Sequence, residues 1–335
     1  MQQASWFEDI VIRCVRYAFA YIPASIGRVF FSKLVSLPFL RFRMLRHGYL
    51  HSPIHWKEIK RRDFSALWII QDTTSRPDIV IYYVHGGGFS MGSSYFYLEF
   101  LLAYITLLQE AGYTNPAILA LEYTLVPDSS YPTQIQQSLS GYRYLLTQIP
   151  ASRIVVSGDS AGGTIILSML LHLAQAFKAS QMHQIPLTDT PAPQFPALAA
   201  LISPWTTLVS PKDQNTSSDY LDATSLHLYA RQYSSAHSTS DPLISPGNCK
   251  DTALWKRASP EKGYFVIFGK EEVFAPEIRK WVSLMEEDVG VDIGVKEEKG
   301  GIHAWPVASL FLSSSKEARQ KGLKNLVSQI RERVG

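Results

Sequence analysis

The sequence contains few cysteines, few charged residues and no long apolar run near its N-terminus. Its 335 residues include two cysteines, Cys14 and Cys249, which excludes a small domain held together by several disulfides and suits a reducing compartment. Neither cysteine lies in a CxxC pair of the kind that binds metal. With 46% hydrophobic and 18% charged residues, the chain has the composition of a globular protein and not of a disordered one.

The N-terminus carries no pattern typical of an export signal or a membrane span. The first nine residues lack the basic region that begins a signal peptide. The longest uncharged run there, residues 17–27, has eleven residues, whereas a spanning helix needs about twenty. We therefore expect an intracellular protein that is not secreted, located in the cytoplasm or peripherally on a membrane.

Positive charge is concentrated at the N-terminus. Residues 1–62 hold eleven Lys and Arg against three acids, and the remaining residues hold 21 against 26. The basic residues alternate with short apolar runs at roughly helical spacing, and Pro23 and Pro38 are expected to divide the segment into short helices. Basic residues among apolar helices suit an anionic membrane surface. They form no recognisable nucleic-acid-binding motif, so no nucleic-acid partner is expected.

From about residue 66 the sequence alternates between apolar strands and helices. Nearly continuous apolar strands indicate an α/β fold, in which helices cover both faces of a mostly parallel sheet. Residues 203–242 are rich in Ser, Thr, Asp and Tyr and read as an insertion on that sheet. The expected strands are 66–70, 78–84, 117–121, 153–156, 197–202 and 264–268, and the expected helices are 95–110, 133–148 and 161–179.

The run Gly158-Asp159-Ser160-Ala161-Gly162 has the pattern GxSxG between an expected strand and an expected helix. This context is typical of a nucleophile elbow, a tight turn whose glycines let the serine stand clear of the backbone. Ser160 would then lie at a helix N-terminus, where the helix dipole stabilises developing negative charge. Taken alone, the pattern also fits a glycine-rich turn capped by a serine.

A second glycine-rich run, His85-Gly86-Gly87-Gly88-Phe89, follows the expected strand that ends at Val84. Three consecutive glycines let backbone N–H groups approach a ligand closely, and an acyl-transfer enzyme needs such donors for its tetrahedral oxyanion. Two such runs, each after a strand and in this order, favour acyl-transfer chemistry over flexible turns.

An enzyme of this type also needs a base and an acid, which follow the serine in the order acid, then histidine. His303 lies in a glycine-flanked loop after the last expected strand and is the best-placed base. The other downstream histidines lie in an expected helix, a Pro-rich loop or the polar insertion: His172, His183, His227 and His237. Three glutamates after strand 264–268 compete for the role of the acid: Glu271, Glu272 and Glu277.

Taken together, these motifs resemble the hormone-sensitive-lipase-like branch of the α/β-hydrolases over about residues 66–310. Within that branch the chain looks closest to the fungal members that include steryl-acetyl hydrolases. The matching runs, in the family's order, are HGGGF at 85–89, EYTLVP at 122–127 followed by Tyr131-Pro132, GDSAGG at 158–163, SPW at 203–205, DPL at 241–243 with Ser245-Pro246, and His303.

The resemblance implies an α/β-hydrolase fold with an eight-stranded, mostly parallel sheet, helices on both faces and a helical cap. The cap would combine residues 1–62 with an insertion at about 205–240, and residues 63–335 would form the catalytic domain. Carried over by position, the triad is Ser160, Glu272 and His303, and the oxyanion donors are the backbone N–H groups of Gly87, Gly88 and Ala161. The family usually has aspartate at the position of Glu272, so Glu271 stays open as an alternative acid.

The sequence therefore predicts a serine carboxylic-ester hydrolase that removes an acetyl or short acyl group from a hydrophobic alcohol, without a metal or an organic cofactor. Aromatic and aliphatic residues in the expected cap favour an apolar ester. The same elbow would also serve an acyltransferase, a natural-product tailoring enzyme that cyclises or cleaves its substrate, or a catalytically silent receptor. The sequence leaves open whether the chain forms a homodimer.

Overall fold

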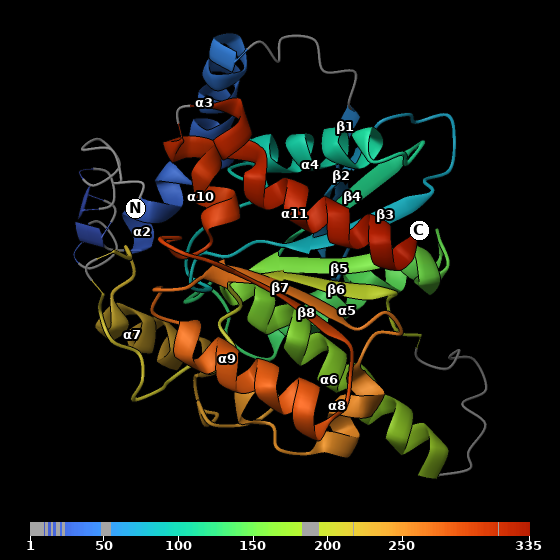
Figure 1. Ribbon diagram of the computed structural model, residues 1–335, viewed down its shortest axis with the longest axis vertical. Helices are drawn as coiled ribbons and strands as arrows, with labels where there is room; N and C mark the ends of the chain where they lie inside the picture. Colours follow the sequence, from blue (N-terminus) through green and yellow to red (C-terminus); the bar gives the residue numbers. More distant parts are fainter. Residues whose placement is uncertain are drawn as a thin grey trace.

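Eight strands form one sheet in the computed structural model, in the order β1-β2-β4-β3-β5-β6-β7-β8 (Figure 1). The run from β4 to β8 is parallel, whereas β1 and β2 pair antiparallel with their neighbours. The structure describes residues 10, 13, 14, 16, 17, 21, 24–47, 55–182, 194–216, 218–313 and 315–335. The strands are β1 His55–Lys60, β2 Ser65–Ile70, β3 Ile79–Val84, β4 Pro116–Glu122, β5 Ile154–Asp159, β6 Leu198–Ile202, β7 Tyr264–Gly269 and β8 Ile293–Glu298.

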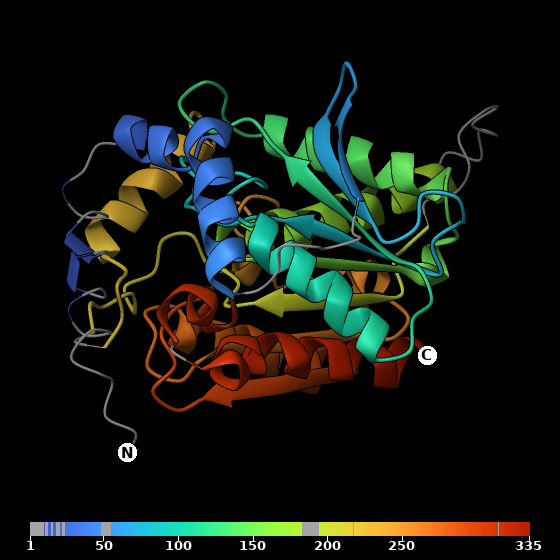
Figure 2. The ribbon, with the colours of Figure 1, turned by 90° about the horizontal axis from the view of Figure 1, so that it is seen from above.

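Helices cover both faces of this sheet. The face covered by α4 and α11 is opposite the face covered by α5, α6 and α8 (Figures 1 and 2). The helices are α2 Ala24–Phe30, α3 Lys33–His47, α4 Leu98–Glu110, α5 Thr133–Leu146, α6 Ala161–Met182, α7 Ala223–Ser234, α8 Thr252–Ala258, α9 Ala275–Ser283, α10 Trp305–Leu312 and α11 Lys316–Val334.

The central strands are apolar at every position because each face of the sheet contacts a helical layer. In β3, Val80, Tyr82 and Val84 join the core beneath α5 and α6. The alternate residues of the same strand join the core beneath α4 and α11. Successive strand side chains point to opposite faces, so a strand buried on both faces shows no polar alternation.

The fold class predicted from the sequence is confirmed, and each of the six expected strands corresponds to a strand of the sheet. The sequence prediction missed the two edge strands, β1 and β8. Their sequences, HWKEIK and IGVKEE, carry charges and are partly exposed. An edge strand has a neighbour on one side only and needs less apolar surface, so its hydrophobic pattern is weak.

The N-terminal segment differs from its expected form in two respects. Residues 55–60 form β1, so the segment expected to be helical up to residue 62 contains a strand of the sheet, and its described helices end at His47. Pro38 lies inside α3 and does not end it. Pro38 has no backbone N–H and cannot donate a hydrogen bond to the carbonyl of Leu34. Leu34 is 86% exposed, so water can bond that carbonyl instead. Pro23 lies outside the described residues.

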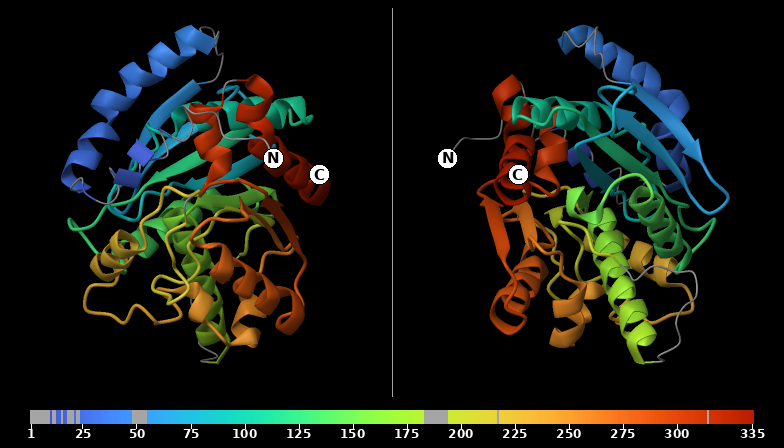
Figure 3. Two further views of the ribbon diagram at one scale, coloured as in Figure 1. Left: turned by 60° about the vertical axis from the view of Figure 1, so that its left-hand side comes forward. Right: turned by 90° about the vertical axis from the view of Figure 1, so that its right-hand side faces the viewer.

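The N-terminal helices and α7 lie at the end of the molecule toward which the parallel strands point (Figures 1 and 2). Helix α3 runs along the β1–β2 edge of the sheet (Figure 3). Because α7 belongs to the insertion after β6, the two parts expected to form a cap lie at the same end of the sheet. No helix among the described residues combines the length and the apolar character that crossing a membrane requires.

Candidate active site

Ser160 occupies a strained turn between β5 and α6. Its φ is 52°, a left-handed value that costs energy for any residue with a Cβ and that is concentrated at functional sites. A Cβ on Gly158 would lie 2.8 Å from the carbonyl oxygen of Val84, and a Cβ on Gly162 would overlap that same oxygen. Both glycines are therefore needed for the turn to pack against the end of β3, as a nucleophile elbow requires.

Backbone hydrogen bonds connect this elbow to the neighbouring strand ends. The amide of Ser160 donates to the carbonyl of Ile202 at the end of β6 (3.0 Å). The amide of Ser203, the next residue, donates to Ile267 in β7 (2.8 Å), and the amide of Trp205 donates back to Ser160 (3.1 Å). The carboxyl ends of β5, β6 and β7 therefore form one continuous edge that carries the serine.

Asp159 joins the elbow to the glycine-rich loop after β3. Its buried carboxylate accepts hydrogen bonds from the hydroxyls of Tyr83 (2.8 Å) and Tyr97 (2.7 Å) and from the amide of Gly86 (2.9 Å). Burial raises the pKa of Asp159, and the tyrosine hydrogen bonds act against that rise. These three donors hold the two glycine-containing turns together.

The loop Gly86–Gly88 leaves two donors unused. Gly87 and Gly88 have φ values of 106° and 60°, and a Cβ on Gly88 would lie 2.9 Å from the ring of Tyr229 in α7. Within the described part of the chain, the amides of Gly87, Gly88 and Ala161 donate no hydrogen bond. Ala161 is the first residue of α6, so its N–H also belongs to the positive end of a helix dipole.

His303 lies in the loop between β8 and α10 and is buried. The residue after it, Ala304, has a φ of 49°, a second strained position at the site. The rings of Phe274 and Tyr220 meet the imidazole edge-on at centroid distances of 5.0 and 5.8 Å. Phe274 also stacks on Trp205 at a centroid distance of 5.3 Å. Because the amide of Trp205 donates to Ser160, these aromatic contacts connect the imidazole with the elbow.

Glu272 is the carboxylate that the structure places beside His303. Its Oε1 lies 3.6 Å from Nδ1 of the imidazole. Its Oε2 accepts from Oγ of Ser203 (2.7 Å) and from the amide of Gly269 (2.9 Å). The distance of 3.6 Å exceeds a hydrogen bond, and such contacts in unliganded sites often shorten only when substrate is bound.

The other two candidate carboxylates, Glu271 and Glu277, bond groups other than the imidazole of His303. Glu271 is exposed and accepts from the amide of Gly300 (2.9 Å). Glu277 accepts from Oγ1 of Thr207 (3.1 Å) and Oγ of Ser210 (2.9 Å). Burial would raise the pKa of Glu277, but these hydrogen bonds and nearby lysines outweigh it and hold the pKa below its usual value. Glu277 therefore anchors the insertion, at a distance from the imidazole.

Both members of the buried pair, Glu272 and His303, have pKa values above their usual ones, for different reasons. Burial raises the pKa of Glu272, because the charged form loses its hydration. For His303, burial alone would lower the pKa, but the neighbouring Glu272, Asp219 and Asp159 carboxylates outweigh it, and the pKa lies above its usual value. A histidine in this setting accepts a proton readily.

The remaining downstream histidines lie in other contacts. His172 in α6 contacts the hydroxyl of Tyr131 (3.1 Å), and His237 meets the same ring edge-on. His227 pairs with Asp213 at 2.9 Å. His183 lies outside the described residues. Among the described residues, no three His, Cys, Asp or Glu side chains form a group that could hold a metal ion.

Sequence reasoning missed two residues at the site. Ser203 lies in the SPW motif, which was noted without a role for its hydroxyl, and that hydroxyl bonds Glu272. Asp219 lies in the polar insertion, and its buried carboxylate accepts from the amides of both Val273 (2.9 Å) and His303 (3.0 Å). No local pattern marks Asp219, because its partners lie 54 and 84 residues away along the chain.

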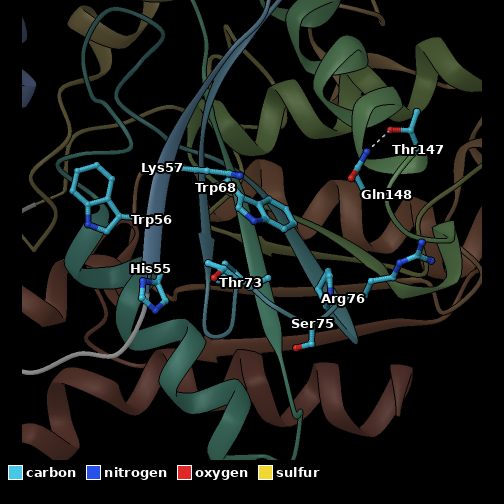
Figure 4. A pocket seen from close by; sticks show the side chains of 11 residues that line it. His55, Trp56, Lys57, Trp68, Thr73, Ser75, Arg76, Thr147 and Gln148 are labelled. Carbon is cyan, nitrogen blue, oxygen red and sulfur yellow. Dashed lines mark hydrogen bonds between the residues drawn. The ribbon is translucent and has the colours of Figure 1, made fainter.

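A surface hollow of about 350 Å³ lies away from these residues (Figure 4). It is lined by the start of β1, by β2, by the β2–β3 loop and by the two residues that follow α5. The β2–β3 loop enters β3 at its amino end, whereas Ser160 lies at the carboxyl end of β5. Since ligands of parallel α/β sheets bind at the carboxyl ends of the strands, this hollow is not the candidate active site.

Comparisons with known proteins identify the family of this chain. A family model described as alpha/beta hydrolase fold matches residues 81–307. The chain is 28% identical over 262 residues to mug81 of Schizosaccharomyces pombe, named as a candidate steryl acetyl hydrolase, covering 75% of this chain and 64% of that protein. It is 28% identical to an acetyl-hydrolase of Streptomyces hygroscopicus, covering 67% of each chain. It is 24% identical to steryl acetyl hydrolase 1 of Saccharomyces cerevisiae, covering 61% of this chain and 47% of that protein.

Solved structures show the same fold. An esterase from the bacterial hormone-sensitive lipase family superposes with a TM-score of 0.73 at 20% identity, covering 98% of each chain. An esterase/lipase from an uncultured bacterium superposes with a TM-score of 0.70 at 20% identity, covering 99% of each. The family that the motifs indicated is confirmed: this chain belongs to the alpha/beta hydrolase fold family.

Proposed function

We propose that this chain is a serine carboxylic-ester hydrolase with Ser160 as nucleophile, His303 as base and Glu272 as acid. The observation that carries the proposal is the arrangement at one sheet edge. A strained elbow serine, unused backbone N–H donors and a buried His–Glu pair all lie at the carboxyl ends of β3 and β5 to β8. These are the parts that acyl transfer needs.

The reaction follows from the roles of these groups. His303 takes the proton of the Ser160 hydroxyl as its oxygen attacks the ester carbonyl. The oxyanion accepts hydrogen bonds from the amides of Gly87, Gly88 and Ala161, and its collapse expels the alcohol, which takes the proton from His303. Water then attacks the acyl-enzyme with His303 again as base. The bond between the acyl carbon and Oγ of Ser160 breaks, Oγ takes the proton back from His303, and the carboxylic acid leaves. Glu272 holds the imidazole and stabilises its positive charge, and no step requires a cofactor.

For the substrate, we propose an ester of a hydrophobic alcohol with an acetyl or short acyl group. Aromatic rings line the predicted site: Phe89, Tyr229 and Phe274 are buried, and Tyr220 is partly buried. The names of the yeast and bacterial relatives, steryl acetyl hydrolase and acetyl-hydrolase, support the same choice. This chain spans between about half and two thirds of the relatives' length, so their activities serve as guides for the substrate series to be tested.

The test is hydrolysis of p-nitrophenyl esters of increasing acyl length, followed by acetyl esters of hydrophobic alcohols. We expect the wild-type protein to prefer acetate over longer chains and to lose activity on Ser160→Ala. Product analysis with and without a competing alcohol separates hydrolysis from acyl transfer. Absence of turnover together with absence of labelling by a serine-directed phosphonate would instead favour a receptor.

We also propose that the N-terminal helices contact an anionic membrane, which suits an intracellular protein acting on apolar esters. Apolar side chains of α2 and α3 are exposed, and residues 10–57 contain no acid. The exposed side chains are Ile26, Val29, Phe30, Leu34, Val35, Phe39 and Phe42.

Many of the basic residues in this segment bond within the protein, so apolar substitutions make the cleaner membrane test. Arg28 pairs with Asp128, Lys33 with Glu58 and Arg43 with Glu99. We expect the double variant Leu34→Ser and Phe42→Ser to sediment less with anionic vesicles than the wild type. Leu228→Ser, on the exposed side of α7, is the control. A variant that changes self-association and leaves vesicle binding intact would assign this face to a homodimer.

A further inference from the structure

A second buried carboxylate lies beside the proposed triad. Asp219 belongs to the insertion after β6, is 1% exposed, and does not contact the imidazole ring through any hydrogen bond among the described residues. Its Oδ1 accepts from the amides of His303 (3.0 Å) and Tyr220 (2.8 Å), and its Oδ2 accepts from the amide of Val273 (2.9 Å). A buried carboxylate is costly unless donors satisfy it, and here three backbone N–H groups do so.

Two of these donors belong to the loops that carry the proposed acid and base. Val273 directly follows Glu272 in the loop between β7 and α9. His303 lies in the loop between β8 and α10. The two oxygens of one side chain therefore connect the two loops, and the distance between Glu272 and His303 depends on how those loops are held.

The loop of Asp219 is in turn connected to the N-terminal segment. The guanidinium of Arg16 donates to the backbone carbonyl of Asp219 and to that of Thr216 (2.7 Å). The amide of Asp219 also donates to Oγ1 of Thr216 (3.1 Å). Arg16 therefore contacts the same short turn that presents Asp219 to the triad loops.

We propose that Asp219 is a positioning residue for the proposed hydrolysis: supplied by the cap, its carboxylate clamps the acid loop to the base loop, and Arg16 holds the turn that carries it. The inference depends on the proposed function. It assigns to the cap a role in aligning the catalytic groups, in addition to covering them.

The carboxylate of Asp219 also acts on the imidazole electrostatically. Three carboxylates raise the pKa of His303: Glu272 from the loop after β7, Asp159 from β5 and Asp219 from the insertion. The aromatic neighbours Tyr220 and Phe274 carry no charge at neutral pH. Removal of one carboxylate charge therefore disfavours the imidazolium, and the neutral base persists to lower pH.

The test is Asp219→Asn with Asp213→Asn as its matched control. Asp213 is another buried aspartate of the insertion, but it pairs with His227 (2.9 Å) and with the amide of Ser210 (3.2 Å), away from the triad loops. In Asp219→Asn the side-chain NH₂ has to face an N–H donor, which breaks one clamp bond. Activity against p-nitrophenyl acetate is measured over pH, together with the melting temperature of each variant.

For Asp219→Asn we expect kcat to fall about 10- to 100-fold with KM nearly unchanged, because small misplacements of catalytic groups cost rate. The acid limb of the kcat/KM profile should move to lower pH. Asp213→Asn should keep the wild-type kcat and the wild-type acid limb. A kcat and acid limb of wild-type value in Asp219→Asn would overturn the proposal, as would losses in both variants that track their melting temperatures.

Arg16→Ala keeps the inference testable if Asp219→Asn does not fold. We expect a several-fold loss of kcat with the acid limb unmoved, because the carboxylate remains in place. An unchanged kcat would overturn the role of Arg16. Wild type and Ser160→Ala are measured in the same assay. A wild type without activity would refute the proposed function itself, whereas an active wild type with a fully active Asp219→Asn refutes only the clamp.

Discussion

The loops of the proposed triad and the N-terminal segment both bury polar groups, but the hydrogen bonding of those groups differs. At the proposed triad, Oε1 of Glu272 and Nδ1 of His303 lack hydrogen bonds among the described residues although both are buried. In the N-terminal segment, Arg43 binds the carboxylate of Glu99 and the carbonyl of Leu310. Buried groups with incomplete partners are expected where chemistry occurs, and fully partnered ones where a segment docks.

The comparison changes the meaning of the charge asymmetry in the sequence. The basic N-terminus suggests a free cationic surface, yet Arg16, Arg28, Lys33 and Arg43 all bond within the protein. These four side chains therefore fasten the segment to the rest of the protein. The exposed side chains of α2 and α3 include apolar residues such as Leu34 and Phe42 as well as Arg41. The proposed active site lies after residue 62, in a part of the chain whose charge balance, 21 basic against 26 acidic residues, does not mark it.

Ser160→Ala tests the proposed triad and has the largest expected effect, a loss of kcat. Loss of a nucleophile typically costs about 10⁶-fold in kcat, and a hydroxyl removed from a small turn should leave the melting temperature nearly unchanged. Hydrolysis of p-nitrophenyl acetate and thermal melting measure both. Ser168→Ala, at a buried serine of α6 outside the site, should retain full activity. Equal activity of both variants would contradict the assignment.

Glu272→Gln should lower kcat by about 10⁴-fold, because the amide cannot stabilise the imidazolium. Glu271→Gln is the matched control, since this neighbouring side chain is exposed and bonds only the amide of Gly300 in the described residues. We expect the control to stay within about twofold of wild type, as surface changes usually do. A larger loss in Glu271→Gln would reverse the assignment of the acid.

Arg43→Ala tests how the N-terminal segment docks on the rest of the protein. It leaves the buried carboxylate of Glu99 without its partner, and breaking a buried ion pair typically costs about 3–5 kcal/mol. Urea unfolding measures the loss in the free energy of unfolding. Arg41→Ala changes an exposed arginine of the same helix and should cost less than about 0.5 kcal/mol. Similar losses in both variants would show that α3 is not fastened through this pair.

The smallest expected effect is a shift in the pH dependence of kcat/KM. Because His303 must be neutral to accept the serine proton, activity falls as pH decreases through its pKa, by about tenfold per unit below it. The neighbouring carboxylates raise the pKa of His303 above its usual value of 6.5. The acid limb of kcat/KM should therefore lie above pH 6.5, and a limb below that value would show that the carboxylates do not face the imidazole as described.

Local sequence was sufficient for the elements whose causes are local. The elbow at Ser160 follows from two glycines that a tight turn requires, and His303 follows from its place in a glycine-flanked loop. Six strands follow from apolar runs that are buried on both faces. The edge strands β1 and β8 could not be read in this way, because an edge needs little apolar surface.

Features that depend on distant contacts were harder to read from the sequence. The residues after β7 leave Glu271 and Glu272 both open as the acid. The family resemblance selects Glu272, and in the structure that side chain lies beside the imidazole. Asp219 meets Val273 and His303 through the packing of three separate loops. Pro38 within α3 depends on solvent reaching the carbonyl of Leu34, which a pattern of residues does not reveal.

The central claim is that Ser160 is the nucleophile of an acyl-transfer site activated by His303. It is tested most directly by treating the protein with a fluorophosphonate and locating the adduct by peptide mass spectrometry. The account predicts one adduct on the peptide containing Ser160, formed in proportion to the loss of esterase activity and formed far more slowly in His303→Ala. An adduct on another residue, or full activity after complete labelling of Ser160, would contradict it.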